Sequence, residues 1–137
     1  GTLQVDYTPA ESTGSMFGGN SNWRGPIWFP MNYLILDSLS KFSDYYGADY
    51  EVEFPTNSGE MMNIKDAAEG VSRRLLAMFV PNEKGVVPMY DGYEKLHDDS
   101  HLFFEYFDGD TGKGLGANHQ TGWTGLISEI ILQLHKK

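Results

Sequence analysis

The sequence contains no cysteine among its 137 residues. This absence excludes a disulfide scaffold, a thiol nucleophile and a zinc site built from thiolates. It also favours a reducing compartment, and the first residues show no basic segment followed by an apolar run, so no signal peptide is visible. The location stays open, with a lean towards the cytoplasm.

Long apolar runs and positive charge are also scarce. The longest candidate run, residues 126–134, is interrupted by Ser128, Glu129 and Gln133, and it is far shorter than the ~20 apolar residues that span a bilayer. Ten Lys and Arg stand against 19 Asp and Glu, for a net charge of −9. Because this charge repels phosphate, we expect neither nucleic acid nor a membrane as partner. A neutral ligand such as a sugar is compatible with it.

What the chain has in abundance is aromatic side chains. Phe, Trp and Tyr make up 14% of the residues, against 21% for all charged types together. The hydrophobic fraction of 40% is enough for a packed core in one domain. So many rings in so short a chain indicate flat apolar surfaces in addition to the core.

Hydrophobic periodicity predicts three helices, over residues 27–46, 63–80 and 121–136, and alternation predicts strands over 50–54 and 100–107. The first helix repeats Trp28, Met31, Ile35, Leu39 and Phe42 at helical spacing. The second repeats Ile64, Ala68, Val71, Leu75 and Met78, with Asn63 as its expected N-cap. The third repeats Trp123, Leu126 or Ile127, Ile130 and Leu134.

A first cluster of candidate site residues lies before the first helix. Residues 18–28 read Gly-Gly-Asn-Ser-Asn-Trp-Arg-Gly-Pro-Ile-Trp. The indoles of Trp23 and Trp28 can stack on a sugar ring, and the guanidinium of Arg24 can donate hydrogen bonds to sugar hydroxyls. The alternative is that both indoles belong to the core and that Arg24 pairs with a buried carboxylate.

A second cluster places one carboxylate inside an aromatic run. Residues 102–107 read Leu-Phe-Phe-Glu-Tyr-Phe. In a strand, Glu105 shares a face with Phe103 and Phe107, because alternate residues point the same way. A Glu flanked by rings is a candidate general acid or base for glycoside cleavage. The alternative is a Glu at the rim of the core whose carboxylate reaches water.

A third cluster precedes the last helix. Residues 116–123 read Gly-Ala-Asn-His-Gln-Thr-Gly-Trp. His119 and its neighbours offer several hydrogen-bonding groups, and Trp123 offers a stacking face. The alternative is helix capping by Asn118 or Thr121, with Trp123 in the core.

The sequence lacks a complete metal-binding motif. Residues 108–110 resemble the opening of a calcium loop, but Lys113 and His119 occupy the positions that need Gly and Glu. A turn is the better interpretation. His97, Asp99 and His101 could share one strand face and bind a metal, but a solvated loop is favoured over a metal site. We expect neither a metal nor a cofactor.

Together, the three clusters resemble segments of glycoside hydrolase family 63, which includes processing α-glucosidases and bacterial relatives. They occur in the family's order, and the likeness extends from about Asp6 to the end. The resemblance implies a mainly α fold that is part of an (α/α)6 barrel, with about three long helices, short β-strands and long loops. It also implies that residues 1–137 form the C-terminal part of a catalytic domain.

The resemblance further implies an inverting glycosidase that hydrolyses α-glycosidic, most simply α-glucosidic, bonds. It assigns Glu105 as the general base and places Trp23, Arg24, Trp28, His119 and Trp123 at the sugar pocket. The family's general acid is an Asp well upstream of the Trp-Arg-Gly segment, and no Asp of this chain takes that role. We therefore expect the chain to be inactive alone.

The expected partners are an oligosaccharide or disaccharide substrate and either the remainder of the barrel or a second copy of this chain. Two other classes stay open from sequence. One is a non-catalytic carbohydrate-binding module that uses its tryptophans as stacking platforms. The other is a structural piece whose rings serve only core and interface.

Overall fold

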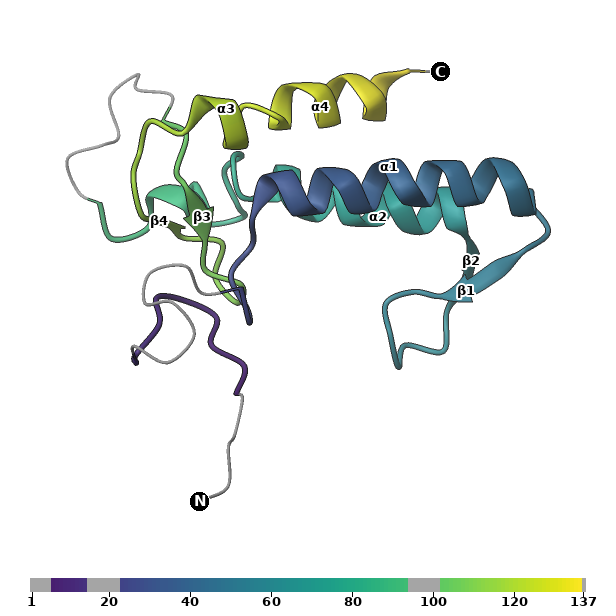
Figure 1. The fold of residues 1–137 in the computed structure, drawn as a ribbon, viewed down its shortest axis with the longest axis horizontal. Helices are drawn as coiled ribbons and strands as arrows, with labels where there is room; N and C mark the ends of the chain where they lie inside the picture. The colour runs from purple at the N-terminus through teal and green to yellow at the C-terminus, as the bar shows by residue number, and fades with distance from the viewer. Residues whose placement is uncertain (1–5, 15–22, 94–101, 137) are drawn as a thin grey trace.

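A computed structural model describes residues 6–14, 23–93 and 102–136 and is mainly helical, as predicted (Figure 1). In chain order the elements are α1 (Phe29–Tyr46), β1 (Glu51–Glu53), β2 (Met61–Asn63), α2 (Ile64–Ala77), the short 3-10 helix η1 (Pro88–Tyr90), β3 (Tyr106–Phe107), β4 (Gly114–Leu115), α3 (Thr121–Thr124) and α4 (Ile127–His135). Helices α1 and α2 lie side by side, with α4 along them; the β1–β2 hairpin is at one end and β3–β4 at the other (Figure 1). Membership of a complete barrel stays a prediction.

Helix α1 confirms the first predicted helix to within two residues. Pro30 sits in the first turn, where its missing N–H costs no hydrogen bond, and Gly47 ends the helix at a φ of 77°. The periodic residues are only partly buried: Trp28 is 4% exposed, whereas Ile35 is 50% exposed. Other α1 side chains, Phe29 and Leu36, join the core instead.

Helix α2 begins as predicted. The side-chain oxygen of Asn63 accepts a hydrogen bond from the backbone N–H of Asp66 at 2.8 Å, which is the expected N-cap geometry. The predicted face is confirmed, since Ile64, Leu75 and Met78 are buried. The buried and half-buried members of that face are Ile64, Ala68, Val71, Leu75 and Met78.

The predicted strand over 50–54 is β1, which pairs antiparallel with β2 in the register Val52↔Met62. Strand β2 was not predicted, because its three residues lack alternation and run directly into α2. The strand predicted over 100–107 is regular only at β3, although residue 103 also forms an isolated bridge to residue 119. Residues 100 and 101 lie outside the described part of the chain.

The prediction of one continuous last helix is wrong. Helix α3 ends at Thr124, and α4 begins at Ile127. Gly125 lies at the break, where its low helix propensity weakens continuity. The buried Thr124 hydroxyl also donates a hydrogen bond to the backbone carbonyl of Phe104, which ties α3 to the segment that carries Glu105.

The core lies where the start of α1, the end of α2, β3 and the start of α4 meet. Phe29, Phe107 and Ile130 are fully buried there. The rings of Phe29 and Phe107 meet edge to face with centroids 5.4 Å apart. Next to them, Ile27 and Phe107 exchange two backbone hydrogen bonds, at 2.8 and 3.0 Å. The start of α1 is therefore fixed against β3.

Across the described ranges, every helix is too short or too polar to cross a membrane.

Replacing Asn63 by Ala should lower the free energy of unfolding by about 1 kcal/mol, because the Asp66 amide loses its acceptor. Asn63→Ser, which keeps an acceptor oxygen, is the matched control and should recover most of the loss. Chemical denaturation of the protein and both variants measures the difference. Equal destabilisation by Ser and Ala would contradict the capping role.

Candidate active site

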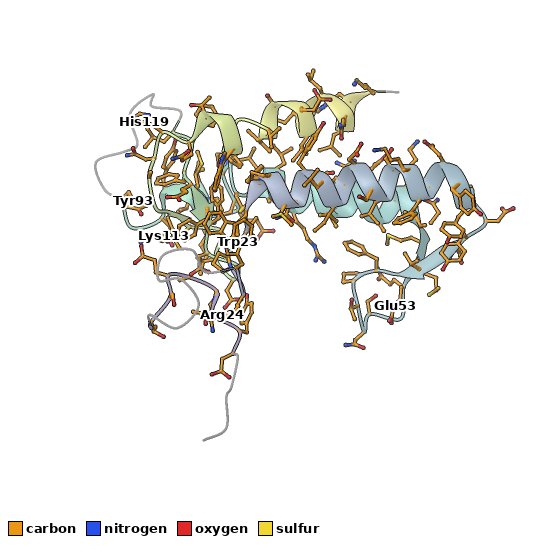
Figure 2. All side chains as sticks on the ribbon, in the orientation of Figure 1. Trp23, Arg24, Glu53, Tyr93, Lys113 and His119 are labelled. Carbon is orange, nitrogen blue, oxygen red and sulfur yellow. The ribbon has the colours of Figure 1, made fainter. Side chains whose placement is uncertain are left out.

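The fold brings the three sequence clusters to one end of the molecule. The Ile27–Phe107 bridge joins the first cluster to the second. The backbone N–H of Glu105 donates to the carbonyl of Ala117 at 2.7 Å, and the N–H of Gln120 donates to the carbonyl of Phe103 at 2.8 Å, which join the second cluster to the third. Trp23 and His119 lie at this end, and Glu53 of the β1–β2 hairpin lies at the other (Figure 2).

Glu105 is half-buried, and its carboxylate is held from within the chain. Its Oε2 atom accepts a hydrogen bond from the backbone N–H of Ala117 at 3.1 Å. A hydrogen bond to an ionised oxygen is stronger than one between neutral groups. Fixing one carboxylate oxygen also orients the other, which suits a group that must accept a proton in a set direction.

The alternation predicted around Glu105 is visible in the burial from Leu102 to Tyr106, but it is wrong at Phe107, which was expected on the face of Glu105 and is fully buried in the core. Leu102, Phe104 and Tyr106 are buried, whereas Phe103 and Glu105 are half-buried. Glu105 therefore faces away from the core on a segment whose other side is anchored in it.

Stacked rings lie beside this segment. Trp23 stacks on Trp28 with centroids 4.6 Å apart and planes 8° from parallel, and Tyr106 stacks on Trp28 at 4.6 Å and 23°. Trp123 meets Trp28 at 5.6 Å with tilted planes. Trp28 is buried by these contacts, while Trp23 remains 55% exposed. The open stacking surface is thus Trp23, with Trp28 as its support.

Tyr106 connects the rings to the carboxylate. Burial raises the pKa of its phenol, and the negative charges of Glu11 and Glu105 raise it further. The hydroxyl therefore stays protonated at neutral pH. The sequence predicts Tyr106 only as one member of the aromatic run. Its position next to Glu105 could have indicated a buried ring that supports the site.

Arg24 and His119, the two polar candidates, each make a backbone contact that fixes the position of the main chain. The carbonyl of Arg24 accepts a hydrogen bond from the Thr8 N–H at 3.2 Å, and the Arg24 side chain is half-buried. His119 is exposed and forms a bridge to Phe103. Their contacts with sugar, like those of Trp23, Trp28 and Trp123, stay predictions.

Backbone hydrogen bonds decide two questions left open by the sequence, namely the cap of the last helix and the calcium-like segment. Capping of the last helix by Asn118 or Thr121 is wrong, because Gln120 is the N-cap of α3 and no side chain closes that cap. The calcium-like segment is a turn: Asp108 Oδ1 accepts from the N–H groups of Asp110 at 2.8 Å and Thr111 at 2.9 Å.

Within the described ranges, no three acidic or His side chains are grouped to hold a metal ion. The His and Asp residues of segment 97–101 lie outside those ranges, since the description resumes only at residue 102.

A half-buried carboxylate and a stack of indoles lie on joined segments at one end of the molecule, and these are groups that glycoside hydrolases use, namely an acid or base and a platform for a sugar ring. The chain belongs to glycosyl hydrolase family 63: the sequence model of that family's C-terminal domain matches residues 13–133. It is therefore a member of a glycosidase family.

Individual relatives agree with this assignment. An uncharacterized protein of Saccharomyces cerevisiae, YMR196W, is 49% identical over 93% of this chain and 12% of its own length. Mannosyl-oligosaccharide glucosidase of the same yeast is 28% identical over 84% of the chain and 11% of its own length. Alpha-glucosidase 2 of Arabidopsis thaliana is 31% identical over 80% of the chain and 11% of its own length. The chain thus spans about an eighth or less of these relatives' lengths.

Trp28 and Trp23 should respond differently to truncation. Trp28→Ala should destabilise the protein by about 3–5 kcal/mol, because a buried indole is removed from the ring stack. Trp23→Ala should cost much less, since half of that ring is already in water. Both variants should lose the near-UV circular dichroism signal of the stacked indole pair. Equal destabilisation by the two variants would contradict the division into platform and support.

Proposed function

We propose that the chain supplies the general base and part of the sugar pocket of an inverting glycosidase acting on α-glucosides. Support for the substrate class comes from two relatives whose names are mannosyl-oligosaccharide glucosidase and alpha-glucosidase 2. The general acid is assigned to no Asp of this chain. In this proposal it comes from the remainder of the catalytic domain.

Glu105 acts on water in this mechanism. The water oxygen attacks the anomeric carbon from the side opposite the leaving group, while the Glu105 carboxylate takes the water proton. The glycosidic C–O bond breaks, and the acid protonates the departing oxygen. The single observation that carries this role is the half-buried carboxylate fixed by the Ala117 N–H at 3.1 Å. A carboxylate held in one direction loses little freedom when it aligns with water.

In this proposal the pocket residues bind the sugar in two ways, by ring stacking and by hydrogen bonding. Trp23 offers the exposed ring face for stacking, with Trp28 holding it in place, and Trp123 offers a second, partly exposed ring. Arg24 and His119 are the proposed hydrogen-bonding partners of sugar hydroxyls. A planar guanidinium can donate two parallel hydrogen bonds to neighbouring oxygens.

Replacing Glu105 by Gln in the complete protein should lower kcat on an α-glucosyl oligosaccharide by about 10²–10⁴-fold. Gln keeps an oxygen that can accept from Ala117, so binding and stability should change little. In the parent protein, NMR of the first product should detect β-glucose, the inverted anomer. Turnover within a few-fold of the parent, or α-glucose as the first product, would reject the assignment.

The matched control for this experiment is Glu53→Gln. Glu53 is exposed on the hairpin at the far end from His119 and Trp23 (Figure 2). Its carboxylate accepts from the Gly59 N–H at 2.8 Å, and the Gln oxygen can accept in the same way. This variant should keep the kcat of the parent.

A second candidate function is a non-catalytic sugar-binding module. The observation in its favour is the open face of Trp23, which could hold a sugar without any catalytic group. Titration of the isolated 137-residue chain with maltooligosaccharides separates the two functions. A module binds sugar unaided, whereas part of a shared pocket does not.

We also propose that one face of α1 packs against further helices of the barrel. This outer face of α1 consists of Met31, Leu34, Ile35, Leu39 and Phe42, and four of these side chains are between 44% and 57% exposed. An apolar stripe of this size usually meets a partner. The relatives are about eight times longer than the matched chain, which supports barrel helices as the occupant in preference to a second copy of this chain.

Ile35→Asp should therefore destabilise the complete protein by about 3 kcal/mol or more, since it buries an unpaired charge. Lys41→Ala, on the same helix, removes only an exposed pair with Asp37 and should leave the stability almost unchanged. Thermal unfolding of both variants measures the difference. An equally small effect for Ile35→Asp would reject the proposed contact. Concentration-dependent dimers of the complete protein that Ile35→Asp dissociates would favour self-association instead.

A further inference from the structure

A tight backbone turn lies directly against the Glu105 carboxylate. Gly116 has a φ of 70°, in the left-handed region, and it immediately precedes Ala117, whose N–H binds Glu105. A Cβ atom built on Gly116 would lie 2.6 Å from Oε2 of Glu105 and 2.9 Å from its Cβ. It would also lie 2.8 Å from Cε1 of Tyr106. These separations are too short for real contacts between such atoms.

The positive φ alone does not explain this crowding. Gly47, Gly59 and Gly85 have φ values of 74–77°, and a Cβ atom on each would meet nothing within 4 Å. At those positions glycine relieves backbone strain only. At Gly116 the missing side chain also makes room for the carboxylate.

We propose that Gly116 is a positioning residue for Glu105: it lets the backbone approach closely enough for the Ala117 N–H to hold the carboxylate in its catalytic direction. This inference rests on the proposed role of Glu105 as the base. Any side chain at position 116 must either push the carboxylate away or lift the loop from it. Both movements break the hydrogen bond from Ala117.

The first test compares Gly116→Ala with Gly85→Ala in the complete protein, with α-glucosyl fluoride as substrate. Both variants carry a similar backbone strain, but only the methyl group added at position 116 would collide with Glu105. We expect kcat to fall about 100-fold in Gly116→Ala, the size of loss that a displacement of ~1 Å can cause, with KM changed by less than about threefold. Gly85→Ala should keep kcat within about twofold, because strain away from the site affects stability only. Equal kcat values for the two variants would overturn the inference.

The second test asks whether Gly116 acts through Glu105. In Glu105→Ala, added azide can replace water: its nitrogen bonds to the anomeric carbon, the C–F bond breaks, and fluoride leaves with the electron pair. The product is glucosyl azide, and no proton has to be removed, so no base is needed. Adding Gly116→Ala to this background should lower the azide-supported rate by less than about threefold, because residues that act as a unit are not additive. A further loss of about 100-fold would show a structural role instead.

A third variant avoids any collision. An amide-to-ester replacement at residue 117, introduced with the α-hydroxy analogue of alanine, removes the N–H and leaves Gly116 unchanged. We expect kcat to fall by about 10-fold or more, because the carboxylate loses the donor that holds it in one direction. An unchanged kcat would overturn the inference even if Gly116→Ala fails to fold.

The two proposals fail in different ways. Full activity of Glu105→Ala without azide would reject the role of Glu105 itself. An inactive Glu105→Ala together with an active Gly116→Ala and an active ester variant would reject only the positioning role.

Discussion

The backbone bridge between Ile27 and Phe107 is the constraint on which the site depends. Its two hydrogen bonds join segments that are 80 residues apart in the sequence. The residues next to them, Trp28 and Tyr106, stack face to face as a result. A shift of one residue in this register would separate the rings of Trp28 and Tyr106, because neighbouring residues of an extended segment point to opposite sides. The phenylalanine core around Phe29 and Phe107 prevents such a shift, since both rings are fully buried.

This arrangement places the half-buried Glu105 next to a packed layer of aromatic rings. Trp28 and Tyr106 are buried, and each lies next to a more exposed residue, Trp23 in one case and Glu105 in the other. The third cluster and the residue that follows it hold the same segment, since the carbonyl of Ala117 accepts from the Glu105 N–H and the hydroxyl of Thr124 donates to the carbonyl of Phe104. The position of Glu105 is therefore determined by contacts within this chain.

The sequence predicted the features that periodicity and side-chain chemistry encode. Helices α1 and α2 and the Asn63 cap follow from apolar spacing and from an amide at the start of a helix. The break between α3 and α4 was missed, because a single glycine such as Gly125 does not by itself end a helix and the accompanying hydrogen bond from Thr124 is tertiary.

Within the site, the candidate side chains could be named in advance, but their division into support and platform could not. Trp23 and Trp28 look alike in sequence, and only packing makes one buried and the other open. The Ala117 amide gives no side-chain signal at all. A backbone donor is found only when the turn that presents it is known, and the glycine at position 116 was its sole trace in the sequence.

Inversion requires two carboxyl groups at a defined separation, about 6.5–9.5 Å, so that a water molecule fits between one of them and the sugar. In the proposed mechanism, this chain fixes the Glu105 end of that distance. The other end depends on how the chain meets the part of the domain that carries the acid. On our proposals, the outer face of α1 is that junction, and it lies on the helix that has Trp28 as its N-cap and Phe29 in its first turn. Packing along α1 would thereby be transmitted to the ring stack, so that the contact that completes the domain also sets the distance between base and acid.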